Sequence, residues 1–162
     1  MIFAEIEAFA AALPRTGAVA GLDLGTKTIG VAVSDGLRAI ATPLVTIRRT
    51  KFTADAAELD RLLAERAVVG LILGLPRNMD GSEGPRAQST RAFARNLDAR
   101  APRPLAFWDE RLSTVAAERA LLEADTTRKR RGEVIDHVAA SYILQGALDR
   151  MGRIAAGTDD AG

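Results

Sequence analysis

The chain of 162 residues is 48% apolar and 27% charged, a composition that predicts one globular domain with a full core and excludes a disordered protein. The absence of cysteine excludes disulfides and thiolate chemistry, and the single histidine excludes a metal site built from several histidines. Any metal centre must therefore rest on carboxylates, which suit hard ions such as Mg²⁺ or Mn²⁺, while the formal net charge of +1 leaves the kind of partner open.

Neither a membrane span nor an export signal is indicated. No run approaches the roughly 18 apolar residues that a span needs. The first residues carry Glu5 and Glu7 where an export signal would be basic. We therefore expect a cytoplasmic protein with no membrane partner.

The first half of the chain is predicted to contain one short helix, three strands and a longer helix. Helical spacing of apolar residues indicates a short helix that ends at Pro14. Apolar runs at 18–24 and 29–35, joined by the turn GTKT, favour an antiparallel hairpin, which a third run at 39–47 extends into a meander. A helix is expected over 52–67, with Thr53 as its N-cap.

The second half alternates strands and helices. Continuous apolar residues at 68–76 are typical of a buried parallel strand, and the glycine-rich loop GLPRNMDGSEGP leads into a helix from Pro85 to about Ala99. A strand at 104–110, a helix capped by Ser113 or Thr114, a mobile basic connector at 126–132 and a final helix from Glu133 follow. The pattern predicts an α/β domain with a mixed sheet over 18–152, a helical extension at 1–17 and a disordered tail at 153–162.

Three acids occupy positions where a carboxylate is unexpected. Asp23 interrupts an apolar strand and shares one strand face with Val19 and Gly21. Glu110 ends the strand at 104–110, with Asp109 pointing to the opposite face. Asp136 belongs to the apolar stripe of the final helix and is therefore aimed at the sheet; the other members of this stripe are Ala139, Ala140, Ile143, Ala147 and Leu148.

If these acids converge, they form a site for hard divalent ions. Two such ions held by carboxylates can activate a water molecule and stabilise the leaving oxygen in phosphodiester hydrolysis. Simpler interpretations remain open at this stage. Asp23 could cap the turn GTKT, and Arg111 could pair with Asp109 or Glu110.

Basic residues gather in two clusters, 48–51 and 128–131, and arginines recur through the segment 86–100. Such runs suit contacts with nucleic-acid phosphates, and they equally suit a solvated surface. Aromatic residues amount to only 4%, so binding of RNA would depend on backbone charge more than on base stacking.

Four motifs in order resemble the YqgF/RuvX family of ribonuclease H-like proteins: GLDLGTKTIGVAVSD, LGLPRNMDGSEGPRAQSTRAFARNL, DERLSTVAAERAL and VIDHVAASYILQGALD. The resemblance covers about Val19 to Met151. It implies a ribonuclease H-like fold with a five-stranded mixed sheet, namely the antiparallel three-strand meander and two parallel strands, with helices on both faces.

The resemblance also implies a function and site residues. It implies a metal-dependent endonuclease that processes the 5′ end of the 16S ribosomal RNA precursor, with kinship to Holliday junction resolvases. Asp23, Glu110 and Asp136 fall on the positions of the catalytic, metal-binding acids, with two Mg²⁺ or Mn²⁺ ions expected. His137 follows Asp136 where many relatives carry a lysine-like residue, and Glu133 is a further candidate ligand.

Contacts to the nucleic acid are expected from polar side chains beside these acids. The candidates are Lys27, Asn78, Ser82, Arg86, Arg111, Ser113, Thr114, Arg128, Lys129, Arg130 and Arg131. The loop glycines would let backbone N–H groups approach phosphates.

Other functions stay open at this point. The partner would be precursor RNA or a pre-ribosomal particle, or branched DNA if the chain is a resolvase, which requires a homodimer and not a monomer. The motif DLGTKTIG also resembles the phosphate loop of sugar kinases, actin and heat-shock ATPases, but those proteins need two domains. A non-catalytic ribosome assembly factor is the last alternative.

Overall fold

The computed structural model describes residues 1–112 and 128–157, with the side chains of the last helix from Asp136 onward. Six strands form one mixed sheet in the order β1-β6-β5-β2-β3-β4. The strands β2 (Ala18–Leu24), β3 (Thr28–Ser34) and β4 (Ala41–Arg48) form an antiparallel meander. The strands β5 (Val68–Leu75), β6 (Leu105–Asp109) and β1 (Ile2–Phe3) extend the sheet in parallel from β2.

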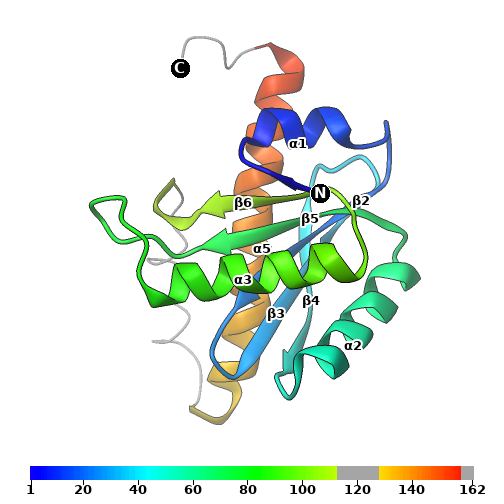
Figure 1. Ribbon diagram of the computed structural model, residues 1–162. Coiled ribbons are helices and arrows are strands. Elements are labelled where there is room, and N and C mark those ends of the chain that lie inside the picture. Colours follow the sequence, from blue (N-terminus) through cyan, green and yellow to red (C-terminus); the bar gives the residue numbers. More distant parts are fainter. Residues whose placement is uncertain (113–127, 158–162) are drawn as a thin grey trace.

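Helices cover both faces of the sheet (Figure 1). The helix α5 (Arg128–Ala156) lies behind the sheet, while α2 (Phe52–Glu65) and α3 (Pro85–Arg100) lie in front. The short helix α1 (Ile6–Ala12) packs against α5, and a 3₁₀ turn, η1 (Glu110–Leu112), follows β6. Because β2 is central and covered on both sides, all seven of its residues are buried.

Alternating side chains of the strands build two separate cores. On the α5 face, Val19 and Ile72 pack with Ala140, Ile143 and Leu144 of α5. On the opposite face, strand residues such as Leu22 and Leu73 pack against Leu59 of α2 and Phe93 of α3. The apolar stripe predicted for the final helix is therefore confirmed, since all five of its apolar members are buried.

Two local expectations were wrong. Residues 2–3, expected to be helical, form strand β1, which pairs with Leu105 and Ala106 and raises the strand number from five to six. The N-cap of α2 is Lys51 and not Thr53. Here buried Asp55 accepts hydrogen bonds from the backbone N–H and hydroxyl of Thr50, which ties the helix start to the preceding segment.

The basic segment at 128–132 also differs from expectation. The helix α5 begins at Arg128, so these residues form its first turns and not a connector. Residues 153–156, expected in the disordered tail, belong to α5, which ends at Ala156. The helix predicted after Ser113, the rest of the connector and the tail beyond Gly157 lie outside the described residues. No helix in the described part of the chain is long and apolar enough to cross a membrane.

Candidate active site

Asp23 is a buried acid on the central strand, with only 5% of its surface exposed. It lies on the α5 face, because a Cβ atom on Gly21, two residues earlier, would meet the Cβ of Leu144 and the carbonyl oxygen of Ala140. Its register partner on β3 is Gly30. Directly opposite residues of an antiparallel pair share a face, so the space beside Asp23 on β3 carries no side chain.

Gly30 lets the backbone of α5 rest on the sheet next to Asp23. A Cβ atom at Gly30 would lie 2.0 Å from the carbonyl oxygen of Asp136. Thr28, two residues earlier on the same face, donates a hydrogen bond of 2.5 Å from its hydroxyl to Oδ2 of Asp136. The prediction that Asp136 faces the sheet is therefore confirmed, and its carboxylate is held toward the β2–β3 turn.

Glu110 lies on the other side of Asp23, above β5. The strands β2 and β5 run in parallel with Leu22 beside Leu73, so Asp23 and Gly74 are the next neighbours and share the α5 face. A Cβ atom at Gly74 would lie 2.7 Å from Oε1 of Glu110. Glycine at this position leaves the room that the glutamate carboxylate occupies.

Glu110, Asp23 and Asp136 form what we call the acid row, which lies over the aligned strand positions 74, 23 and 30. Neighbouring strands are about 4.8 Å apart, so the carboxylate of Glu110 and the backbone carbonyl of Asp136 lie about one strand spacing to either side of Asp23. All three acids lie over one face of the sheet. A side chain larger than glycine at either flanking position would separate them.

The donor chemistry of the acid row fits hard divalent cations, because it consists of carboxylates alone. Within the described residues, however, no three acidic or histidine side chains are gathered closely enough to form a ready-made metal site. Three carboxylates on one face repel one another in the absence of a counter-charge. A bound cation would favour their approach.

The glycine-rich loop after β5 is fastened by its own polar groups. The side-chain amide of Asn78 donates to Oγ of Ser82, which in turn donates to Asp80. The backbone N–H groups of Asn78, Gly81 and Ser82 all donate within the loop. These three N–H groups are therefore engaged and do not point freely to a phosphate.

Arg111 is engaged with Asp109. Its guanidinium donates to both carboxylate oxygens, at 2.8–3.2 Å, and to the carbonyl oxygen of Met79 at 3.4 Å. The hydrogen bonds from Arg111 hold the pKa of Asp109 below its usual value, and the same pairing raises the pKa of Arg111. Of the two pairings that the sequence left open, the structure contains the one between Arg111 and Asp109.

The remaining candidate residues divide into two groups. Lys27 and Arg86 are exposed near the β2–β3 turn, and Arg86 reaches the carbonyl oxygen of Leu24 at 3.5 Å. The second group lies outside the described part of the structure. It consists of Ser113 and Thr114 and of the side chains of Glu133, Arg128, Lys129, Arg130 and Arg131.

His137 lies beside the acid row, one strand farther from Asp23. Its Nδ1 is 2.8 Å from the hydroxyl of Thr46 on β4. Thr46 is the register partner of Gly30 and shares its face. The imidazole is therefore packed toward the sheet, next to the contact between α5 and β3.

Sequence reasoning missed Thr28, Gly30, Gly74 and Arg49. The two glycines lie inside apolar strands, where glycine signals a close backbone approach without saying what approaches. Thr28 belongs to the motif GTKT, which in the sequence indicates only a turn. Arg49 belongs to the cluster 48–51, and its role depends on contacts that the sequence does not reveal.

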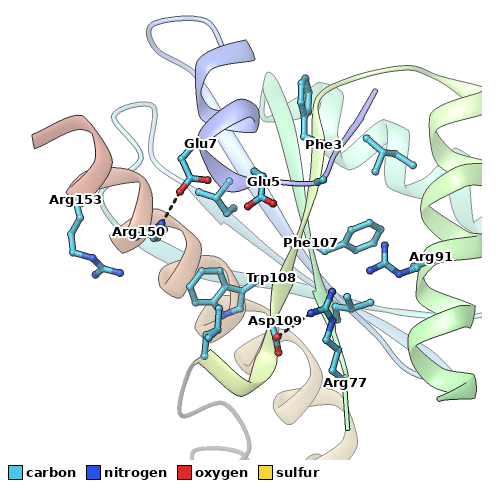
Figure 2. Close-up of a pocket in the computed structure, with 15 residues that line it drawn as sticks. Phe3, Glu5, Glu7, Arg77, Arg91, Phe107, Trp108, Asp109, Arg150 and Arg153 are labelled. Atoms are coloured by element: carbon cyan, nitrogen blue, oxygen red, sulfur yellow. Dashed lines mark hydrogen bonds and ion pairs between the residues drawn. The ribbon is translucent and has the colours of Figure 1, made fainter. Parts of the chain in front are cut away.

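A larger pocket, of about 860 Å³, lies away from the acid row, beside α1 and β6 (Figure 2). Two of its arginines pair with acids of the same pocket: Arg150 with Glu7 at 2.6 Å, and Arg77 with Asp109 at 3.6 Å. Size alone does not make it the active site, because Asp23, Glu110 and Asp136 do not line it.

Comparison with known proteins identifies the family. The family described as RuvX, Holliday junction resolvase, matches residues 17–150. A protein of Cereibacter sphaeroides named "Putative pre-16S rRNA nuclease" is 78% identical over 93% of this chain and 94% of its own. Relatives with the same name in Paracoccus denitrificans and Ruegeria pomeroyi are 78% and 70% identical, each over 93% of this chain and over 96% and 98% of their own lengths.

Solved structures agree on the fold. The RuvC protein of Thermus thermophilus, in complex with a Holliday junction substrate, has a TM-score of 0.51 at 14% identity, over 84% of this chain and 96% of that one. The likeness confirms the ribonuclease H-like fold expected from the motifs. By its sequence over residues 17–150, the chain belongs to the RuvX family.

Proposed function

We propose that this chain is a metal-dependent endonuclease that hydrolyses phosphodiester bonds at the 5′ end of the 16S ribosomal RNA precursor. The observation that carries the proposal is the acid row, in which Glu110, Asp23 and Asp136 lie over one sheet face beside two glycines. The names of its relatives indicate the substrate. With such a substrate, the protein would act in the bacterial cytoplasm.

In this proposal the three acids hold divalent ions, Mg²⁺ or Mn²⁺. When bound, such ions polarise the scissile phosphate and lower the pKa of a coordinated water. Asp23 is fixed by the central strand, Glu110 reaches over Gly74 from the end of β6, and Asp136 is oriented by the hydroxyl of Thr28.

The substrate strand would be held by basic side chains at the same end of the sheet as the acid row. Lys27 and Arg86 project near the β2–β3 turn, and the cluster 128–131 opens the helix that carries Asp136. These cations would contact phosphates without reading sequence. Selection of the cleavage position would then come from the pre-ribosomal particle or the fold of the RNA.

Resolution of branched DNA is the second candidate. It is favoured by the description of the matching family and by the likeness to the RuvC fold. Cutting two strands of a junction symmetrically requires two active sites, and therefore a dimer related by twofold symmetry. The two functions share one catalytic chemistry and differ in substrate and assembly.

The test compares both substrates with the same protein. Wild type and Asp136→Asn are incubated with 5′-extended 16S precursor RNA and with a four-way DNA junction, in Mg²⁺, Mn²⁺ or chelator, while sedimentation gives the oligomeric state. We expect metal-dependent cleavage of the RNA by wild type only. Cleavage of the junction alone by a stable dimer would favour the resolvase, and cleavage in chelator would overturn the metal mechanism.

A further inference from the structure

A pocket of about 200 Å³ lies at the end of β2, on the sheet face opposite the acid row. The backbone of Leu24 and Gly25 forms one wall, and Arg49 and Arg86 form others. Leu24 directly follows Asp23, and successive strand residues point to opposite faces. The pocket and the acid row therefore lie on opposite faces of the sheet, both at the end of β2.

Two guanidinium groups line this pocket and bond to backbone oxygens. Arg49 donates from Nη1 to the carbonyl oxygen of Gly25 at 2.5 Å, and Arg86 donates from Nη2 to that of Leu24 at 3.5 Å. Among the described residues, neither forms an ion pair with an acid, in contrast to Arg77, Arg91 and Arg150 of the larger pocket. Positive charge in the pocket is therefore not neutralised by these residues.

Arg49 is held in place by its surroundings. Its backbone N–H donates to the carbonyl oxygen of Lys27 at 2.8 Å, and its guanidinium lies 5.6 Å from the centre of the Phe93 ring. A guanidinium has five N–H donors, so its bond to Gly25 leaves others for a ligand. An arginine already fixed by packing loses less conformational entropy when it binds an anion.

Other groups around the pocket also suit an oxyanion. The exposed residues Thr26 and Ser89 line it and carry hydroxyl groups. Pro85, the first residue of α3, lines it as well. The positive end of the α3 helix dipole therefore points to the pocket and adds to the charge of the two arginines.

We propose that this pocket binds a backbone phosphate of the nucleic-acid strand, at a nucleotide other than the one that is cut. A nucleic-acid strand that crosses the turn between Leu24 and Thr28 would present one phosphate to the acid row and another to Arg49 and Arg86. The proposal rests on the proposed nuclease function, because it assumes that a nucleic acid passes over this end of the sheet. In this proposal Arg49 and Arg86 hold the nucleic-acid strand in position relative to Asp23.

The test measures binding of a short single-stranded RNA over a range of salt concentrations, in chelator so that no cleavage occurs. The variants are Arg49→Gln, Arg86→Gln and the double variant, since glutamine keeps a donor and removes the charge. We expect the double variant to bind about tenfold more weakly or worse, with a salt slope reduced by about 0.7 for each phosphate that is no longer neutralised. Arg61→Gln, at an exposed arginine of α2 paired with Glu65, removes the same charge elsewhere and should change neither value.

Stability and cleavage separate the outcomes. If Arg49→Gln lowers the melting temperature, Arg86→Gln decides the question, because Arg86 is exposed and its hydrogen bond to Leu24 is long. A salt slope equal to that of wild type in Arg86→Gln and in the folded double variant would overturn the phosphate pocket, even if precursor RNA is cleaved. A reduced salt slope in these variants, without any cleavage by wild type, would support the pocket and contradict the proposed nuclease function.

Discussion

Asp23 and Gly30 face each other across β2 and β3, and the backbone carbonyl of Asp136 occupies the space that a side chain on Gly30 would fill. The consequence is a direct contact between α5 and the sheet at the level of Asp23. One acid is therefore supplied by the strand and the other by the helix, with no side chain at position 30 to separate the helix from β3. Glycine at position 30 is a requirement of this approach.

Gly30→Ala is expected to destabilise the protein and displace α5. The added Cβ would lie 2.0 Å from a backbone oxygen, which cannot rotate away as a side-chain end can. Overpacking of this kind costs about 3 kcal/mol, or about 6–12 °C in melting temperature for a chain of this size. Thermal unfolding measures it, with Gly36→Ala as the control, because a Cβ there meets nothing within 4 Å. Equal melting temperatures for the two variants would contradict the close approach of α5.

Gly74→Ala should separate activity from stability. The added Cβ would meet the ends of two side chains, Cδ1 of Ile143 at 2.5 Å and Oε1 of Glu110 at 2.7 Å. Because such ends can shift, we expect a decrease of about 1–2 kcal/mol in stability. A displacement of Glu110 by about 1 Å should lower cleavage on the order of 100-fold. Melting curves and single-turnover cleavage test this together, and wild-type cleavage by the folded variant would show that Glu110 is not needed where it lies.

Much of the fold could be predicted because its signals are local. The predicted strand at 18–24 has the bounds that the structure shows, and the buried stripe of α5 follows from helical spacing. Strand β1 was missed because Ile2 and Phe3 fit the helical spacing of the residues after them, while their pairing with Leu105 and Ala106 depends on residues about a hundred positions away. The first turns of α5 were missed because basic residues are unfavourable at a helix N-terminus.

The acids of the candidate site could be found from the sequence, because a carboxylate in a strand or on an apolar stripe needs an explanation. Their arrangement could not be found in this way. Gly30 and Gly74 make room for Asp136 and Glu110, and a glycine gives no sign of which group approaches it. Register between β2, β3 and β5 aligns them, and register is a property of the folded sheet.

Asp109→Asn should change how stability depends on pH. Hydrogen bonds from Arg111 lower the pKa of Asp109 in the folded state, so the ionised carboxylate stabilises the fold above its unfolded pKa of about 3.9. This contribution disappears as pH falls through the folded pKa. We therefore expect the variant to melt below wild type at neutral pH and the difference to vanish in acid. Melting curves from about pH 7 to about pH 2 test this, and a difference that stays constant across the series would contradict the pairing.

Asp23→Asn should abolish cleavage without unfolding the protein. The amide has nearly the same size, so the buried site keeps its packing, but it lacks the charge that a hard divalent ion requires. We expect cleavage to fall more than about 100-fold, while the melting temperature in chelator stays equal or rises, because one of three mutually repelling acids is gone. Mn²⁺ at 100 times its Kd should add about 2.7 kcal/mol to the free energy of unfolding of wild type and so raise its melting temperature. The rise should be far smaller in the variant. Calorimetry with Mn²⁺ or chelator measures this independently of cleavage, and an equal rise in both proteins would show that Asp23 does not hold the metal.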